Sequence, residues 1–99
     1  MPITLPIKAS ELAPGEGRAL EFDDNYFALY NDGQTLIVLQ NECPHAGCET
    51  EWNAADRTWD CPCHGSRFEA DGTLKKGPAR EPLQRLTAQT IGDQIQVGD

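Results

Sequence analysis

All four cysteines and both histidines of this 99-residue chain lie in one window of 24 residues, from Cys43 to Ser66. The window contains two short motifs, Cys43-Pro44-His45-Ala46-Gly47-Cys48 and Cys61-Pro62-Cys63-His64-Gly65-Ser66. Thiolate and imidazole are ligands that zinc and iron prefer, and each motif offers both within one tight turn. The chain is therefore expected to fold around a metal centre held between two loops.

Prolines and glycines in both motifs suit tight loops beside a bound group. Pro44 and Pro62 fix φ and carry no N–H that would need a partner. Gly47 and Gly65 permit positive φ or a close approach of the backbone to a ligand. All four are ordinary turn residues, and only their position beside cysteine and histidine makes them informative.

The cysteines allow more than one interpretation. Cys63 directly precedes His64, and adjacent side chains diverge, so Cys61 is the better companion for His64; Cys63 and Cys48 are left over. A Cys₂His₂ zinc site or two structural disulfides would use the same residues. Zinc ribbons and fingers need C-x₂₋₄-C paired with a similar knuckle or with H-x₃₋₅-H, and neither arrangement is present. Two disulfides would leave both histidines beside cysteines without an explanation.

The pattern C-x-H…C-x-x-H, with additional cysteines that give CPHAGC and CPCHGS, resembles the Rieske [2Fe–2S] proteins. In that family two cysteines bind one iron and two histidines bind the other. The resemblance implies Cys43 and Cys61 on one iron, His45 and His64 on the other, and a disulfide between Cys48 and Cys63 as in the high-potential branch. The cofactor that it implies is a [2Fe–2S] cluster.

The resemblance extends to residues around the ligands. Ser66 matches a serine whose hydroxyl donates to a cluster sulfide in high-potential members, and Phe68 stands where those members have a tyrosine. The segment Gly77-Pro78-Ala79 is similar to the proline-containing segment that covers the cluster. The residues implied around the cluster are Gly47, Gly65, Ser66, Phe68 and Pro78. Without the tyrosine hydroxyl, the reduction potential is expected to lie below that of the quinol-oxidising proteins.

The resemblance covers roughly residues 36–83 and implies an electron-transfer protein, not an enzyme. The expected function is that of a soluble Rieske-type ferredoxin, which passes single electrons between a reductase and an oxidase or oxygenase that dock at His45 and His64. Two alternatives follow from the same residues. Residues 59–68 also look like Rieske modules fused to flavin-dependent oxidoreductases, and most oxygenase-linked ferredoxins lack the additional cysteine pair. A subunit of a quinol-oxidising cytochrome bc-type complex is disfavoured by Phe68 and by Ala46, which is leucine in that group.

The length, charge and hydropathy of the chain limit its domain number, its partners and its location. At 99 residues, one Rieske domain over 1–99 is expected, with the cluster-binding portion at about 40–82. The net charge of −8 argues against nucleic acid and anionic membrane surfaces as partners. No run of 18 apolar residues and no secretion signal is visible, so a cytoplasmic protein without membrane insertion is expected.

The remaining chain predicts short strands. Nine glycines and seven prolines with 38% hydrophobic residues indicate a loop-rich, mostly β protein. Expected strands are 3–7, 18–22, 26–30, 35–39, 49–52, 58–60, 86–91 and 94–97, with turns at Asp32-Gly33, Asp71-Gly72 and Gly92-Asp93. Residues 10–15 are expected to form a turn or one helical turn capped by Ser10. Trp52 and Trp59 are expected in the core beneath the loops. The expected fold class is all-β: a Rieske-like fold of small antiparallel sheets with a cluster-binding loop subdomain at one end.

Overall fold

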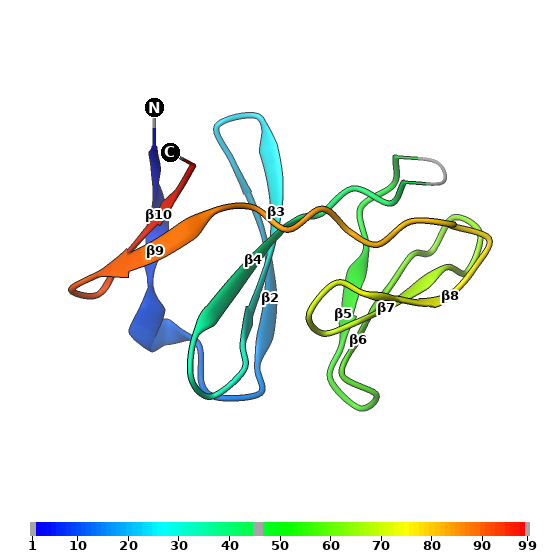
Figure 1. The fold of residues 1–99 in the computed structure, drawn as a ribbon, viewed down its shortest axis with the longest axis horizontal. Helices are drawn as coiled ribbons and strands as arrows, with labels where there is room; N and C mark the ends of the chain where they lie inside the picture. The colour runs from blue at the N-terminus through cyan, green and yellow to red at the C-terminus, as the bar shows by residue number, and fades with distance from the viewer. Residues whose placement is uncertain (1, 45–46, 99) are drawn as a thin grey trace.

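The computed structural model describes residues 2–44 and 47–98, and β-strands are the main regular secondary structure in both ranges. Three antiparallel sheets follow one another along the longest axis of the molecule, which measures 38 × 28 × 17 Å (Figure 1). Their strand orders are β1-β10-β9, β2-β3-β4 and β5-β6-β7-β8. The strands are β1 (Ile3–Lys8), β2 (Gly17–Phe22), β3 (Asn25–Asn31), β4 (Leu36–Gln40), β5 (Glu51–Asn53), β6 (Thr58–Asp60), β7 (Arg67–Glu69), β8 (Leu74–Lys76), β9 (Ala88–Ile91) and β10 (Gln94–Val97). The predicted fold class is confirmed.

The middle sheet is buried on both faces because β3 and β4 each carry an unbroken apolar run. The runs are Phe27-Ala28-Leu29 and Ile37-Val38-Leu39, and all six residues are buried. Successive side chains of a strand point to opposite faces. Ala28, Ile37 and Leu39 accordingly join the core beneath the cysteine loops, whereas Phe27, Leu29 and Val38 join the core shared with the terminal sheet. The molecule therefore has two cores separated by one sheet.

The predicted strands match the observed ones to within two residues because their turn signals are specific. Between β3 and β4, the Asn31 side chain accepts a hydrogen bond from the N–H of Gly33, and one carboxylate oxygen of Asp32 accepts from the N–H groups of Gln34 and Thr35. Gly33 has φ of +96°, a conformation that glycine adopts without strain. Local chemistry thus fixes this hairpin.

A long return segment connects β8 to β9 and crosses the middle sheet (Figure 1). The N–H of Gln40 donates to the carbonyl of Gln84 at 2.8 Å, and the N–H of Leu86 donates to the carbonyl of Val38 at 2.9 Å. Residues 84–86 therefore cover part of the edge of β4 and tie the cysteine-bearing end to the rest of the chain.

Gly17 lies where the middle sheet meets β5. A Cβ at position 17 would lie 2.4 Å from the indole ring of Trp52, closer than any real contact. Trp52 is half-buried and packs against Trp59 with ring centroids 4.8 Å apart and the ring planes tilted by 53°, and Trp59 is fully buried. The predicted core position is confirmed for Trp59, and Trp52 packs at the margin of that core.

The Gly17→Ala variant is expected to lose about 1–3 kcal/mol of unfolding free energy, the usual cost of forcing one extra carbon into a packed site. Urea denaturation measures the loss. The effect should shrink in a Trp52→Leu background, where the smaller side chain leaves room for the methyl group. An equal loss in both backgrounds would show that the ring contact is not its cause.

Ser10 does not cap a helix. The short 3₁₀ turn η1 (Ala9–Glu11) has Lys8 at its N-cap position, and the carboxylate of Glu11 accepts from the N–H of Lys8. Ser10 instead donates from its N–H and its hydroxyl to the two carboxylate oxygens of Asp93, at 2.9 and 2.5 Å. The predicted cap is therefore wrong, because a residue of the distant β9–β10 turn is the better acceptor.

The bond to Ser10 makes the stability pH-dependent. The side-chain and backbone hydrogen bonds from Ser10 lower the pKa of Asp93. A lowered pKa in the folded state stabilises the fold above the ordinary aspartate pKa, and this contribution disappears as pH falls through the folded pKa. Ser10→Ala should therefore cost more unfolding free energy at about pH 7 than at about pH 3, as measured by urea denaturation. In an Asp93→Asn background the cost should not vary with pH.

Candidate metal centre

Two loops of equal length lie at the end of the molecule that is remote from the termini (Figure 1). In the first loop (residues 43–48), the N–H of Cys43 donates to the carbonyl of Cys48 at 2.8 Å, and the N–H of Gly47 donates back to the carbonyl of Cys43 at 2.7 Å. In the second loop (residues 61–66), the N–H of Cys61 donates to the carbonyl of Ser66 at 2.8 Å, and the N–H of Gly65 donates to the carbonyl of Cys61 at 3.1 Å. The two loops share one hydrogen-bonding pattern, so Cys43 and Cys61 occupy equivalent positions.

Glycine is required at the fifth position of each loop. Gly47 has φ of +73° and Gly65 has φ of +82°, in the left-handed region that most L-residues avoid. The predicted use of both glycines for positive φ is confirmed. The turn that they permit is what returns each loop to its starting cysteine.

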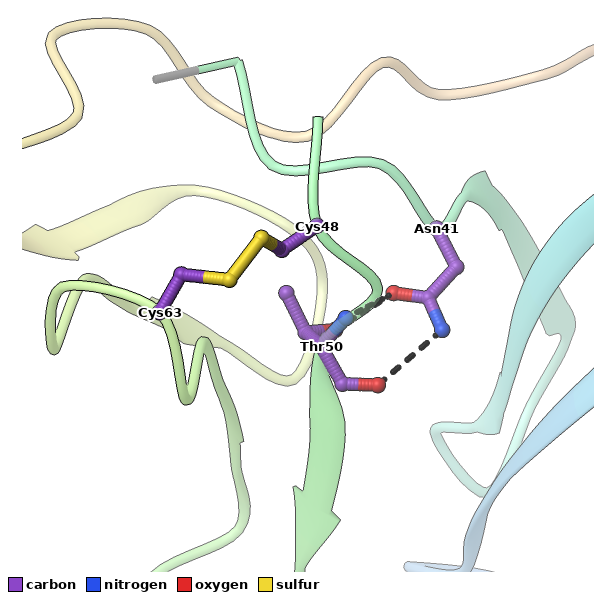
Figure 2. Close-up of a disulfide and its surroundings, with 4 residues drawn as sticks. All are labelled: Asn41, Cys48, Thr50 and Cys63. Atoms are coloured by element: carbon purple, nitrogen blue, oxygen red, sulfur yellow. Dashed lines mark hydrogen bonds between the residues drawn. A yellow bond between two sulfur atoms is a disulfide. The ribbon is translucent and has the colours of Figure 1, made fainter. Parts of the chain in front are cut away.

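The four cysteines divide into two kinds. Cys48 and Cys63 form a disulfide that joins the two loops, with their Cα atoms 6.5 Å apart, and the predicted pairing is confirmed (Figure 2). Cys43 and Cys61 remain thiols, and both are buried in the core that contains Trp59. The sulfur atoms of Cys48, Cys61 and Cys63 all lie within 4.8 Å of one another. One free thiol therefore lies directly beside the disulfide.

Of the two predicted histidine ligands, the structure describes His64. His64 is exposed on the second loop, directly after the half of the disulfide that faces solvent. His45, and with it Ala46, lies outside the described residues. His64 thus lies on the solvent side of the loops, whereas the two free thiols lie on the core side.

The third predicted segment, residues 77–79, packs against the second loop. The N–H of Ala79 donates to the Ser66 hydroxyl oxygen at 3.0 Å, and both residues are buried. The peptide bond between Gly77 and Pro78 is cis. Because the Ser66 oxygen acts as the acceptor in this bond, its own O–H proton remains available to a second acceptor. Phe68 is fully buried in the core with Cys43 and Cys61 and has no polar atom to offer there.

A buried polar pair closes the base of the first loop (Figure 2). The side-chain amide of Asn41 donates to the carbonyl of Thr50 at 3.1 Å, and its oxygen accepts from the N–H and the hydroxyl of Thr50 at 3.0 and 2.5 Å. The N–H of Asn41 also donates to the carbonyl of Tyr26, in β3. Neither residue of this Asn41–Thr50 clamp was among the predicted site residues.

An ion pair closes the base of the second loop. Asp60 and Arg67 are cross-strand partners, and the Arg67 guanidinium donates to Asp60 at 3.0 Å and to Asp56 at 2.6 Å. Burial of the Asp60 carboxyl would raise its pKa, but hydrogen bonds from Asn53, Thr58 and Arg67 outweigh burial and hold the pKa below its usual value. The carboxylate next to Cys61 is therefore ionised and paired. This pair was not anticipated either.

The described residues fit a [2Fe–2S] cluster held as the sequence predicts. Two buried thiols at equivalent points of two loops, neither of them in a disulfide, are a suitable donor set for one iron. The Ser66 hydroxyl has a proton to donate in the same buried region, and an imidazole lies on the outer side. The assignment of Cys43, His45, Cys61 and His64 as ligands stays a prediction.

Comparison with known proteins also supports a [2Fe–2S] cluster. A family model described as Rieske [2Fe-2S] domain matches residues 4–87. The chain is 40% identical over 81 residues to YhfW of Bacillus subtilis (strain 168), whose name includes the words Rieske 2Fe-2S iron-sulfur protein; the match covers 81% of this chain and 16% of YhfW. It is 38% identical over 97 residues to the cytochrome b6-f complex iron-sulfur subunit 1 of Synechocystis sp. (strain ATCC 27184 / PCC 6803 / Kazusa), which covers 91% of this chain and 54% of that subunit.

The fold has close structural neighbours. The ferredoxin of carbazole 1,9a-dioxygenase from Nocardioides aromaticivorans IC177 is similar with a TM-score of 0.73 over 98% of this chain and 96% of that one, at 24% identity, a likeness that concerns the fold. The chain spans about half of the Synechocystis subunit and a smaller part of YhfW. A Rieske domain implies a [2Fe–2S] cluster and a role in electron transfer. With its matched cysteine loops, its disulfide and the family model that covers most of its length, the chain belongs to the Rieske [2Fe-2S] domain family.

Proposed function

We propose that this chain carries single electrons on a [2Fe–2S] cluster, with Cys43 and Cys61 on one iron and His45 and His64 on the other. The observation that carries the proposal is the pair of buried thiols at equivalent positions of two hydrogen-bonded loops. When bound, a cluster with this ligand set supplies a one-electron couple at about −150 to +300 mV.

The surrounding residues hold the ligands still and keep water out. The disulfide joins the two loops, the Asn41–Thr50 pair closes the first loop and the Asp60–Arg67 pair closes the second. Trp59 and Phe68 fill the core on the thiol side. Ligands fixed in this way need little rearrangement when an electron arrives or leaves, which suits a carrier.

Phe68 keeps the reduction potential of the cluster lower because it has no hydroxyl group to donate a hydrogen bond. The Phe68→Tyr variant would place a hydroxyl in the core that contains both thiols, where it can donate to the cluster and stabilise the more negative, reduced form. One such hydrogen bond is worth about 1 kcal/mol, which for a one-electron couple raises the potential by about 40 mV. Protein-film voltammetry measures the shift. Phe68→Leu, which adds no donor, is the control, and an unchanged potential in Phe68→Tyr would refute this role.

We further propose that the chain is a mobile carrier between a reductase and an oxidase or oxygenase, which dock on the end formed by the two loops, around His45 and His64. Two observations support this: His64 is exposed at that end, and Pro78, whose neighbour Ala79 is hydrogen-bonded to the second loop, is also exposed. None of the described residues belongs to a helix that is long and apolar enough to cross a bilayer. The cytoplasmic location expected from the sequence remains part of the proposal.

A second candidate function is that of a subunit or module of a larger oxidoreductase. The 38% identity to a cytochrome b6-f iron-sulfur subunit favours it, as does the small share of YhfW that the chain matches. Stopped-flow mixing of the oxidised protein with a quinol and, separately, with a reduced flavoprotein reductase discriminates the two. Rapid reduction by the reductase alone supports the mobile carrier, whereas rapid reduction by the quinol supports the subunit.

Before these comparisons, reconstitution tests whether the chain binds a [2Fe–2S] cluster. Protein that has been reconstituted with iron and sulfide under anaerobic conditions should contain two irons and two sulfides per chain, absorb visible light and give an electron-paramagnetic signal after reduction. A protein that has its disulfide intact, stays colourless and binds one zinc ion would overturn the proposal in favour of a structural zinc module.

A further inference from the structure

We infer that the chain contains a second metal site, which exists only when the cluster is absent and the disulfide is reduced. In that form Cys48, Cys61 and Cys63 bind one thiophilic divalent ion such as Zn²⁺. The site shares Cys61 with the predicted cluster ligands and does not use Cys43. Its existence is independent of the proposed function, whereas its consequence for iron binding rests on that function.

The positions of the sulfur atoms carry the inference. The sulfurs of Cys48, Cys61 and Cys63 lie within 4.8 Å of one another. In tetrahedral coordination with Zn–S distances near 2.3 Å, neighbouring sulfurs are about 3.8 Å apart. Once the disulfide is broken, Cys48 and Cys63 separate towards that distance while their Cα atoms, 6.5 Å apart, need not move far. Movements of about 1 Å therefore suffice to close the site.

The surroundings also suit a metal ion that arrives from solvent. Cys63 is exposed, Cys48 is half-buried and Cys61 is buried, so the three sulfurs run from the surface into the core. Thiolates select Zn²⁺ over hard ions such as Mg²⁺ and Ca²⁺. The Asn41–Thr50 pair and the hydrogen bonds within the loops do not involve the disulfide, so they remain to hold the cysteines after reduction.

The disulfide acquires a function from this arrangement. Oxidation of Cys48 and Cys63 joins their sulfurs and removes two protons and two electrons, which leaves Cys61 as the single free thiol of the group. The oxidised loops therefore cannot hold Zn²⁺ through these sulfurs, while Cys43 and Cys61 stay available to iron. The bridge thereby closes this route by which zinc could take Cys61 from the iron site, in addition to joining the loops.

The test uses the Cys43→Ser variant of the 99-residue chain, because it lacks one predicted iron ligand and keeps all three sulfurs of the second site. A water-soluble phosphine reduces the disulfide; it becomes the phosphine oxide, and water supplies the oxygen atom and the two protons. The reduced variant is titrated with Co²⁺ as a spectroscopic probe and then with Zn²⁺. It should bind one Co²⁺ with thiolate charge-transfer bands, and Zn²⁺ should displace it.

Three comparisons decide the outcome. The reduced variant should bind more than about 100-fold tighter than the oxidised one, since even an outer-shell partner of a metal ligand is worth ~10–100-fold. Additional replacement of Cys63 by serine should remove most of that gain. Equal affinity in the oxidised and reduced forms, or binding that persists unchanged in denaturant, would overturn the inference. Iron reconstitution of the wild-type chain with its disulfide intact tests the proposed function separately, so the two failures are distinguishable.

Discussion

The Cys61→Ser variant is expected to contain no [2Fe–2S] cluster after reconstitution and to be colourless. Cys61 is one of the two buried thiols outside the disulfide, and the serine hydroxyl is a much weaker ligand for iron than a thiolate. Iron and sulfide content, visible absorbance and the electron-paramagnetic signal of the reduced protein measure the loss.

The matched control is Cys48→Ser, which also replaces a cysteine of these two loops by serine. Cys48 joins the loops and is not a predicted ligand, so this variant should still bind the cluster and should release it faster on dilution or mild heating. If Cys61→Ser contained as much cluster as Cys48→Ser, the assignment of the thiol ligands would be wrong.

The largest loss of stability is expected for the Asn41→Leu variant. Leucine has the same number and branching of side-chain heavy atoms but leaves the N–H and the carbonyl of Thr50 buried without the partners that Asn41 provides. Each unsatisfied buried polar group costs about 1–3 kcal/mol, so the unfolding free energy should fall by about 2–6 kcal/mol. Urea denaturation of the cluster-free protein, with its disulfide intact, measures the change without interference from iron.

Thr50→Val serves as the control for that experiment. Valine keeps the shape and the backbone groups of Thr50 and removes one hydrogen bond, from the hydroxyl to Asn41, so the expected loss is only about 1 kcal/mol. Equal losses in the two variants would show that the backbone bonds of the clamp contribute little. The clamp would then not be what closes the first loop.

The predictions from sequence were most accurate where structure depends on neighbouring residues. The Asp32-Gly33 turn, the paired strands β5 and β6 and the positive φ of Gly47 and Gly65 all follow from local patterns. The disulfide was also anticipated, although from the family resemblance and not from the spacing of cysteines.

What the sequence did not reveal depends on residues that are distant in the chain or chemically unremarkable. Asn41 and Thr50 are nine positions apart and belong to no motif, so nothing distinguishes them from other polar residues until the loop between them is folded. Ser10 was predicted to cap its own turn, but its partner is Asp93, 83 positions away. The cross-strand pair Asp60–Arg67 could have been found, since opposite charges flank the second cysteine motif directly.

The position of β3 and β4 between two cores has a consequence for how the domain comes apart. Each end of the molecule has its own sheet, but neither core is complete without β3 and β4, because alternate residues of these two strands belong to the two cores. Melting should therefore be a single cooperative transition, and the amide hydrogens of β3 and β4 should be the slowest to exchange with deuterium. Transplanting the two cysteine loops onto another scaffold would require moving this sheet with them.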